Sequence, residues 1–196
     1  MENNLFWEII GNYNSKNGEG EYCKEIINKL SVMSPTLIYE FEIILQQKMR
    51  SLCNWDCYGI FALMELVSDD HPFQDFRLWI IAHGESFYVK FLENPELLSD
   101  ELLDAYNHNE FYLESLSSVT LDSLLKQKNI EKMEYFKNKS FLDPREYALN
   151  TDGGYGYISD LSGEKWESDK ELQQRFPKIF DRTEGEFLRY KENQGL

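Results

Sequence analysis

The chain has 196 residues, 42% of them hydrophobic and 15% aromatic, which is long and apolar enough to bury a core as a soluble globular protein. Its 35 acidic and 20 basic side chains give a net charge of −15, which repels phosphate backbones and anionic lipid surfaces. We therefore expect neither a nucleic acid nor a membrane as partner. A basic protein surface is a plausible one, and a charge that only keeps the protein soluble is an alternative of at least equal weight.

Helical spacing of apolar residues runs through most of the chain and predicts a series of short helices. They are expected over residues 4–11, 22–33, 35–49, 55–67, 72–82, 86–93, 96–106, 111–116, 119–128 and 169–176. A polar loop over 13–20 separates the first two. Ser34, as a cap, followed by Pro35 in the first turn gives the clearest helix start. Gly59 lies in a run that is apolar on nearly every side and indicates a close helix crossing.

Beyond Asn138 the composition changes, because prolines and glycines occur there too often for long helices to form. The segment 153–166 could accommodate a small β-hairpin. The predicted fold class is mainly α, a single-domain helical bundle. Its parts are a domain over residues 1–182, made of a helical body (4–142) and an irregular closing segment (143–182), and a solvated tail (183–196).

Three cysteines, Cys23, Cys53 and Cys57, match no zinc-binding spacing, which favours buried inert thiols over metal or redox chemistry. The opening Met-Glu-Asn-Asn has no features of a signal peptide. The apolar runs are far shorter than the ~20 residues that span a bilayer. We expect a cytoplasmic protein.

Residues 68–84 are the most constrained stretch, a carboxylate-rich turn that leads into an apolar helix with Arg77 among its apolar side chains. A partly buried guanidinium keeps its charge and needs a fixed carboxylate or carbonyl partner. In the structural interpretation, Asp70 caps the helix and Asp69 pairs with Arg77. Arg77→Met should then be tolerated far better than Asp69→Ala, because the latter would strand a buried charge.

In the functional interpretation, part of this stretch faces a cleft and binds a ligand or a metal ion. The residues concerned would be Asp69, Asp70, His71 and Arg77, with Glu65 reaching in. His83 shares a helix side with Trp79, which favours a core histidine over a catalytic base. No catalytic residue is assigned; the candidates are Asp69, Asp70, Arg77 and His83. No metal or cofactor motif accompanies them, and we expect neither a metal nor a cofactor.

Several motifs together resemble a bacterial family, the domain of unknown function 4240. They are Phe6-Trp7, the core run from Ser68-Asp69-Asp70 through Phe76-Arg77 to Gly84, Asn94-Pro95, Gly163-Glu164-Lys165-Trp166 and Arg175-Phe176-Pro177. The resemblance covers most of residues 4–182. It departs at His83, where the family usually has Gln, which weakens the case for a catalytic base there.

The resemblance implies no reaction, cofactor or catalytic residue, but it implies that the central and closing motifs belong to one domain. Trp166 would then fold back on the helical body, with Glu164 available to Arg77. This would bring Asp69, Asp70, Arg77, Glu164 and Trp166 together as a binding site.

Three functions follow as hypotheses. The first is an acidic binding protein of the immunity or antitoxin kind that occludes a basic protein, which the net charge of −15 and the lack of catalytic motifs favour. The second is a hydrolase or metal-dependent enzyme built on the Asp/Asp/Arg cluster. The third is a regulatory or scaffold protein. The oligomeric state is open.

Overall fold

The computed structural model of the chain describes residues 1–64, 69–133 and 155–183. The α-helices are α1 (Asn3–Ile10), α2 (Gly18–Leu30), α3 (Pro35–Ser51), α4 (Trp55–Leu63), α5 (Asp70–Ala82), α6 (Glu85–Glu93), α7 (Ser99–His108), α8 (Val119–Lys128) and α11 (Asp169–Arg175). The 3-10 turns are η1 (Ser15–Asn17), η2 (Pro95–Leu98), η3 (Glu114–Ser118) and η5 (Ile158–Asp160), and residues 177–183 are also helical. The described residues hold no strand, which confirms the mainly α fold class.

Local signals explain most helix ends. The Ser34 hydroxyl accepts a hydrogen bond from the Leu37 N–H at 3.4 Å, so Ser34 and Pro35 start α3 as predicted. Helix α2 begins at Gly18, inside the stretch expected to be a loop. Glu19 and Glu21 stand in its first turn, where the helix dipole favours negative charge. None of the described helices combines the length and hydropathy required of a membrane span.

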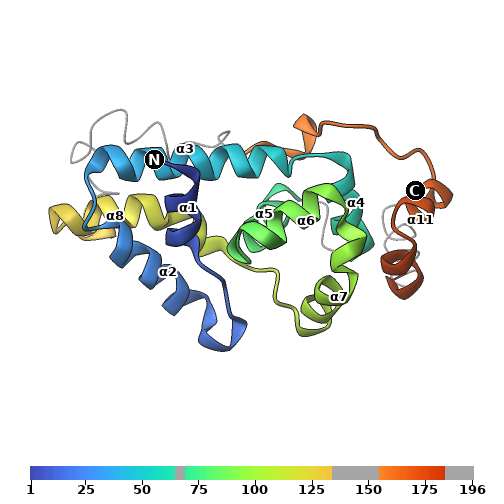
Figure 1. Cartoon of the computed structure of the whole chain (residues 1–196), viewed down its shortest axis with the longest axis horizontal. Helices are drawn as coiled ribbons and strands as arrows, with labels where there is room; N and C mark the ends of the chain where they lie inside the picture. Colours follow the sequence, from blue (N-terminus) through green and yellow to red (C-terminus); the bar gives the residue numbers. More distant parts are fainter. Residues whose placement is uncertain (65–68, 134–154, 184–196) are drawn as a thin grey trace.

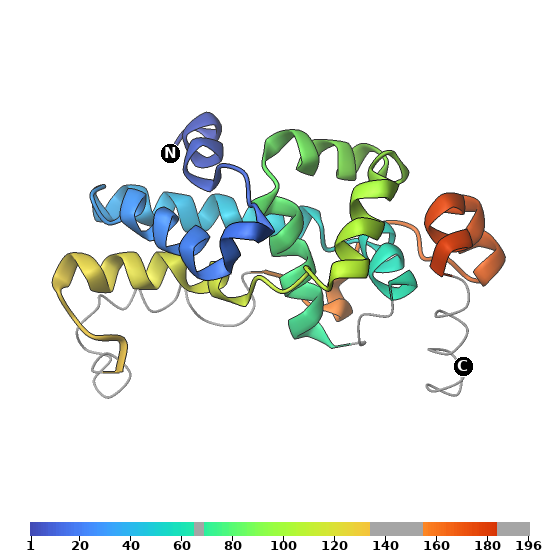
Figure 2. The ribbon, with the colours of Figure 1, turned by 90° about the horizontal axis from the view of Figure 1, so that it is seen from below.

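The helices form an elongated bundle (Figures 1 and 2). Helix α8 packs against both α2 and α3 at one end. Helix α5 lies at the centre, in contact with α3, α4 and α6, and α6 continues through η2 into α7. Both views place α11 at the end opposite α8. The described part of the closing segment, residues 155–183, therefore reaches the end of the bundle opposite α8.

One contiguous apolar core joins the helical body and the closing segment. Leu172, Phe176, Ile179 and Phe180 belong to the same buried cluster as Phe61 of α4 and Phe73, Phe76 and Trp79 of α5. No hairpin occurs in residues 155–166, the described part of the segment 153–166; apart from η5 and one isolated bridge the chain is irregular there. Thr183, placed in the solvated tail, is buried, and the rest of that tail lies outside the described residues.

Gly59 on α4 lies at a close crossing, as the sequence indicates. A Cβ atom there would stand 2.9 Å from Leu172 Cδ1 and 3.3 Å from Trp166 Nε1. We therefore expect Gly59→Ala to lower the free energy of unfolding by about 1 kcal/mol or more, because overpacking outweighs the helix propensity of alanine. Urea denaturation would measure the loss. A stabilised variant would show that the closing segment does not pack on α4.

Candidate functional site

Asp69 and Asp70 stand at the start of α5 with different roles. Asp69 has an extended backbone (φ −124°, ψ 149°), and its carboxylate accepts a hydrogen bond from the His71 N–H at 3.4 Å, so Asp69 is the N-cap. Asp70 is the first helical residue, and its Oδ1 accepts from the Ile158 N–H at 2.7 Å. The sequence interpretation assigned the cap to Asp70. This assignment is wrong because α5 already begins at Asp70, whereas an N-cap residue has an extended backbone and precedes the first helical residue.

Arg77 is completely buried and hydrogen-bonds to main-chain carbonyls. Its Nε donates to the Phe73 carbonyl at 3.2 Å, and its Nη1 donates to the carbonyls of Met49 at 3.1 Å and Tyr155 at 2.6 Å. Its Nη2 donates to the Gly156 carbonyl at 2.9 Å. The guanidinium also lies 4.4 Å from the centre of the Phe73 ring. Burial lowers the pKa of Arg77, yet a guanidinium stays charged in proteins.

Among the described residues, no carboxylate forms an ion pair with Arg77. The expected pairing with Asp69 is therefore wrong. The two residues are eight positions apart, about 12 Å along a helix axis, and the arginine side chain turns instead toward the closing segment. A ligand carboxylate could reach this guanidinium only by displacing residues 155 and 156.

The closing segment is held at this place through its own main chain. The Cys53 thiol donates to the Tyr157 carbonyl at 3.2 Å, and the Ser162 N–H donates to the Cys53 carbonyl at 3.1 Å. The Trp55 N–H donates to the Ser162 carbonyl at 2.9 Å, which completes a single parallel bridge between Asn54 and Ser162. Together with Arg77 and Asp70, these contacts fix residues 155–162 across the junction of α3 and α4.

Glu42 on α3 is a buried carboxyl group that the sequence analysis missed. Its Oε1 accepts hydrogen bonds from Gln46 Nε2 at 3.0 Å and the Tyr155 hydroxyl at 2.9 Å, and its Oε2 accepts from the Thr120 hydroxyl at 2.7 Å. Burial raises the pKa of Glu42, and these bonds only partly oppose the effect. A signal was present, because Glu42 lies at helical spacing from Ile38 and Leu45 on the apolar face.

Trp166 and Glu164 separate in the structure. Trp166 folds back on the body, as the resemblance implies, with its ring centre 6.3 Å from that of Trp55. Glu164 has an exposed side chain whose Oε2 lies 3.8 Å from Arg175 Nη2. Arg175 also pairs with Asp56 at 3.0 Å and Glu171 at 2.6 Å. Glu164 therefore belongs to a surface cluster around Arg175 and does not complete a site with Arg77.

The histidines of the predicted site do not converge on Arg77. His71 is exposed at the start of α5, and Glu65 lies outside the described residues. His83 caps the C-terminal end of α5; its Nδ1 lies 2.8 Å from the Trp79 carbonyl oxygen, and its ring centre lies 4.1 Å from that of Trp79, with the two rings tilted by 48°. Burial lowers the pKa of His83, so its imidazole is neutral at pH 7.

The three cysteines are free and buried, and burial raises the pKa of each thiol, that of Cys23 to about 12. Within residues 1–64, 69–133 and 155–183, no three metal-ligating side chains gather in one place. The geometry therefore describes a polar junction, made of Asp70, Arg77 and Cys53, that fastens the closing segment to the helical body.

Comparison with known proteins gives one match, to the family model described as "Protein of unknown function (DUF4240)", over residues 1–123. No curated protein and no solved structure matches the chain. The matched region contains Asp69, Asp70, Arg77 and His83. It ends before Glu164 and Trp166.

Proposed function

The chain belongs to the DUF4240 family, and from its charge and its buried polar junction we propose that it binds and occludes a basic protein partner, in the manner of an immunity protein or antitoxin. The observation that carries the proposal is the net charge of −15. Among the described residues, only Glu42 and Glu96 are buried carboxylates, and the remaining ones are exposed or half-buried. Their summed field would attract a basic protein and orient it before contact.

The polar junction at Arg77 favours a protein that binds its partner through its outer surface. It argues against an enzyme that uses Asp69, Asp70 and Arg77, because these side chains are already engaged within the fold. Four donor positions of the guanidinium are used by carbonyl oxygens, and the side chain has no exposed area. Asp69 and Asp70 are engaged by backbone N–H groups. The three free thiols suit a reducing compartment, and we place the proposed capture in the cytoplasm.

The proposal predicts a complex with a strong dependence on salt. The test partner is the purified product of a gene adjacent to the one that encodes this chain, chosen for its net positive charge. The association rate constant, measured by stopped-flow fluorescence, should fall at least tenfold between about 50 and 500 mM NaCl, because salt screens the steering field. Absence of a complex with every basic neighbour would refute the proposal, and a complex whose rate ignores salt would favour a scaffold role.

A further inference from the structure

Helix α6 and the 3-10 turn η2 expose large apolar side chains although both elements are well packed. Val89 and Leu92, three residues apart and on one side of α6, are 41% and 40% exposed, and Leu97 on η2 is 63% exposed. Three of the seven exposed large apolar side chains in the described residues thus fall within nine positions. Exposed apolar side chains grouped in this way mark contact surfaces more often than scattered ones do.

The same elements carry a dense negative charge. Residues 85–110 hold seven carboxylates and one lysine, a net charge of −6. Glu85, Glu93, Asp100, Glu101 and Asp104 are exposed, and Glu96 is buried. Two basic side chains lie against these carboxylates: Arg182 pairs with Asp100 at 3.2 Å, and His108 Nδ1 lies 3.6 Å from Asp104. Glu93 and Glu101 take part in no ion pair among the described residues.

The elements that carry these side chains are fixed from behind. Tyr88 and Phe91 of α6 and Leu102 and Ala105 of α7 are buried in the core. Buried Glu96 of η2 accepts hydrogen bonds from the N–H groups of Lys178 at 3.1 Å and Ile179 at 3.3 Å. A partner would therefore meet a preorganised surface, and little conformational entropy would be lost on binding.

We infer that this face, formed by α6, η2 and α7, is where the basic partner docks. Val89, Leu92 and Leu97 would contact apolar side chains of the partner, while Glu93 and Glu101 would meet its lysines or arginines. The partner is thus a protein surface whose apolar side chains are flanked by basic ones. A second copy of this chain is the poorer fit, since self-association would bring two surfaces of net charge −6 together. The inference rests on the proposed function.

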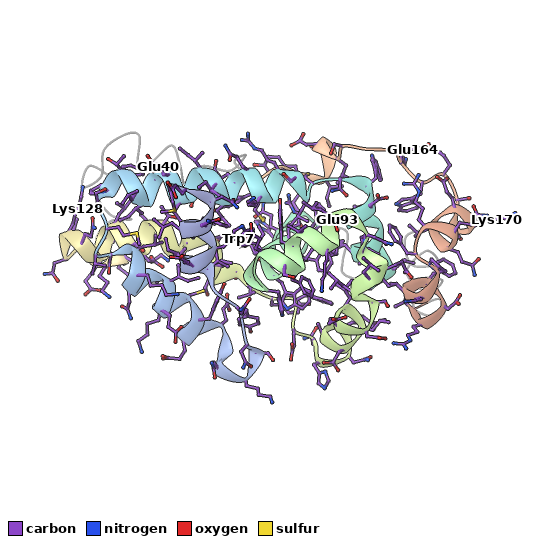
Figure 3. All side chains as sticks on the ribbon, in the orientation of Figure 1. Trp7, Glu40, Glu93, Lys128, Glu164 and Lys170 are labelled. Atoms are coloured by element: carbon purple, nitrogen blue, oxygen red, sulfur yellow. The ribbon has the colours of Figure 1, made fainter. Side chains whose placement is uncertain are left out.

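A synthetic 18-residue helix of leucine and lysine, labelled with fluorescein, can serve as probe in anisotropy titrations of the full chain at 100 mM NaCl. The double variant Glu93→Gln/Glu101→Gln should weaken binding about tenfold. The control Glu25→Gln/Glu131→Gln removes the same charge from α2 and from the end of α8, where Glu25 and Glu131 are exposed. Figure 3 shows Lys128 of α8 at one end of the molecule and Lys170 of α11 at the other, with Glu93 between them. This control should change the Kd less than twofold.

A second pair of variants separates apolar contact from charge. Leu97→Gln should weaken binding of the probe about fivefold, whereas Val32→Gln, at a position that is 85% exposed on another element, should leave it unchanged. If each variant of the proposed face weakens binding no more than its matched control does, the proposed docking face is wrong. The probe would then bind through the overall negative charge alone. If the wild-type chain binds neither the probe nor any basic neighbour, the proposed function itself fails. Circular dichroism of each variant confirms that it is folded.

Discussion

Arg77→Met should lower the free energy of unfolding by about 3 kcal/mol, the largest loss expected from a single substitution in the central stretch. The carbonyls of Met49, Tyr155 and Gly156 would each lose a buried donor, which costs about 1 to 3 kcal/mol apiece. Removal of a buried charge recovers part of this cost. Urea denaturation followed by circular dichroism measures the difference.

Two further variants test the reason for that loss. Asp69→Ala removes only a cap and should cost about 1 kcal/mol, so the order is the reverse of the one that the sequence predicts. Arg77→Lys keeps the charge but has three donors for four carbonyls, and an intermediate loss is expected. If Arg77→Met costs no more than Asp69→Ala, the guanidinium does not hold the closing segment.

Glu42→Gln should stabilise the protein at neutral pH and reduce the dependence of its stability on pH. The usual pKa of the group is about 4.5, and burial raises it in the folded state. The folded state therefore holds the proton more tightly than the unfolded state does. The contribution of Glu42 to the free energy of unfolding is therefore greatest at or below pH 4.5. It falls as the pH rises toward the pKa of the folded state, by about 1.4 kcal/mol for each pH unit in that interval.

Glutamine fits the site because its amide can reproduce the hydrogen bonds. Its oxygen can accept from Gln46 and Tyr155, and its NH₂ group can donate to the Thr120 hydroxyl. The free energy of unfolding should be measured for both proteins from pH 4.5 to 8. Glu25→Gln, the same change at an exposed position, controls for the loss of overall negative charge. A constant difference between wild type and Glu42→Gln across that range would mean that Glu42 is ionised throughout.

The helical body was largely predictable because its signals are local. Ser34 and Pro35 define the start of α3, and Gly11 and Asn94 stand at the ends of α1 and α6. The error at Gly18 has the same origin, since turn-forming residues over 13–20 outweighed the two glutamates of the first turn. Short-range sequence patterns thus predict which segments are helical, but they place the first and last residues of each helix less accurately.

The partner of Arg77 was not predictable for a physical reason. Backbone carbonyls occur at every residue and leave no mark in the sequence, whereas carboxylates do, so the nearby aspartates attracted the interpretation. Tyr155 and Gly156 are 78 and 79 residues away from Arg77 along the chain. Only the fold brings them together. The return of Trp166 to the helical body, which the resemblance led us to expect, is confirmed, although the matched family region ends at residue 123.

The hold on residues 155–162 has a consequence for how this protein can evolve. Arg77, Asp70 and Cys53 bond to peptide groups, so substitutions of Ser159 or Leu161 leave those contacts in place. Gly156 is different: its φ is +77°, and a Cβ atom would stand 3.1 Å from Cys53 Sγ. The segment can therefore accept substitutions around one position that favours glycine, while an insertion or deletion near Gly156 would shift the register of every bond.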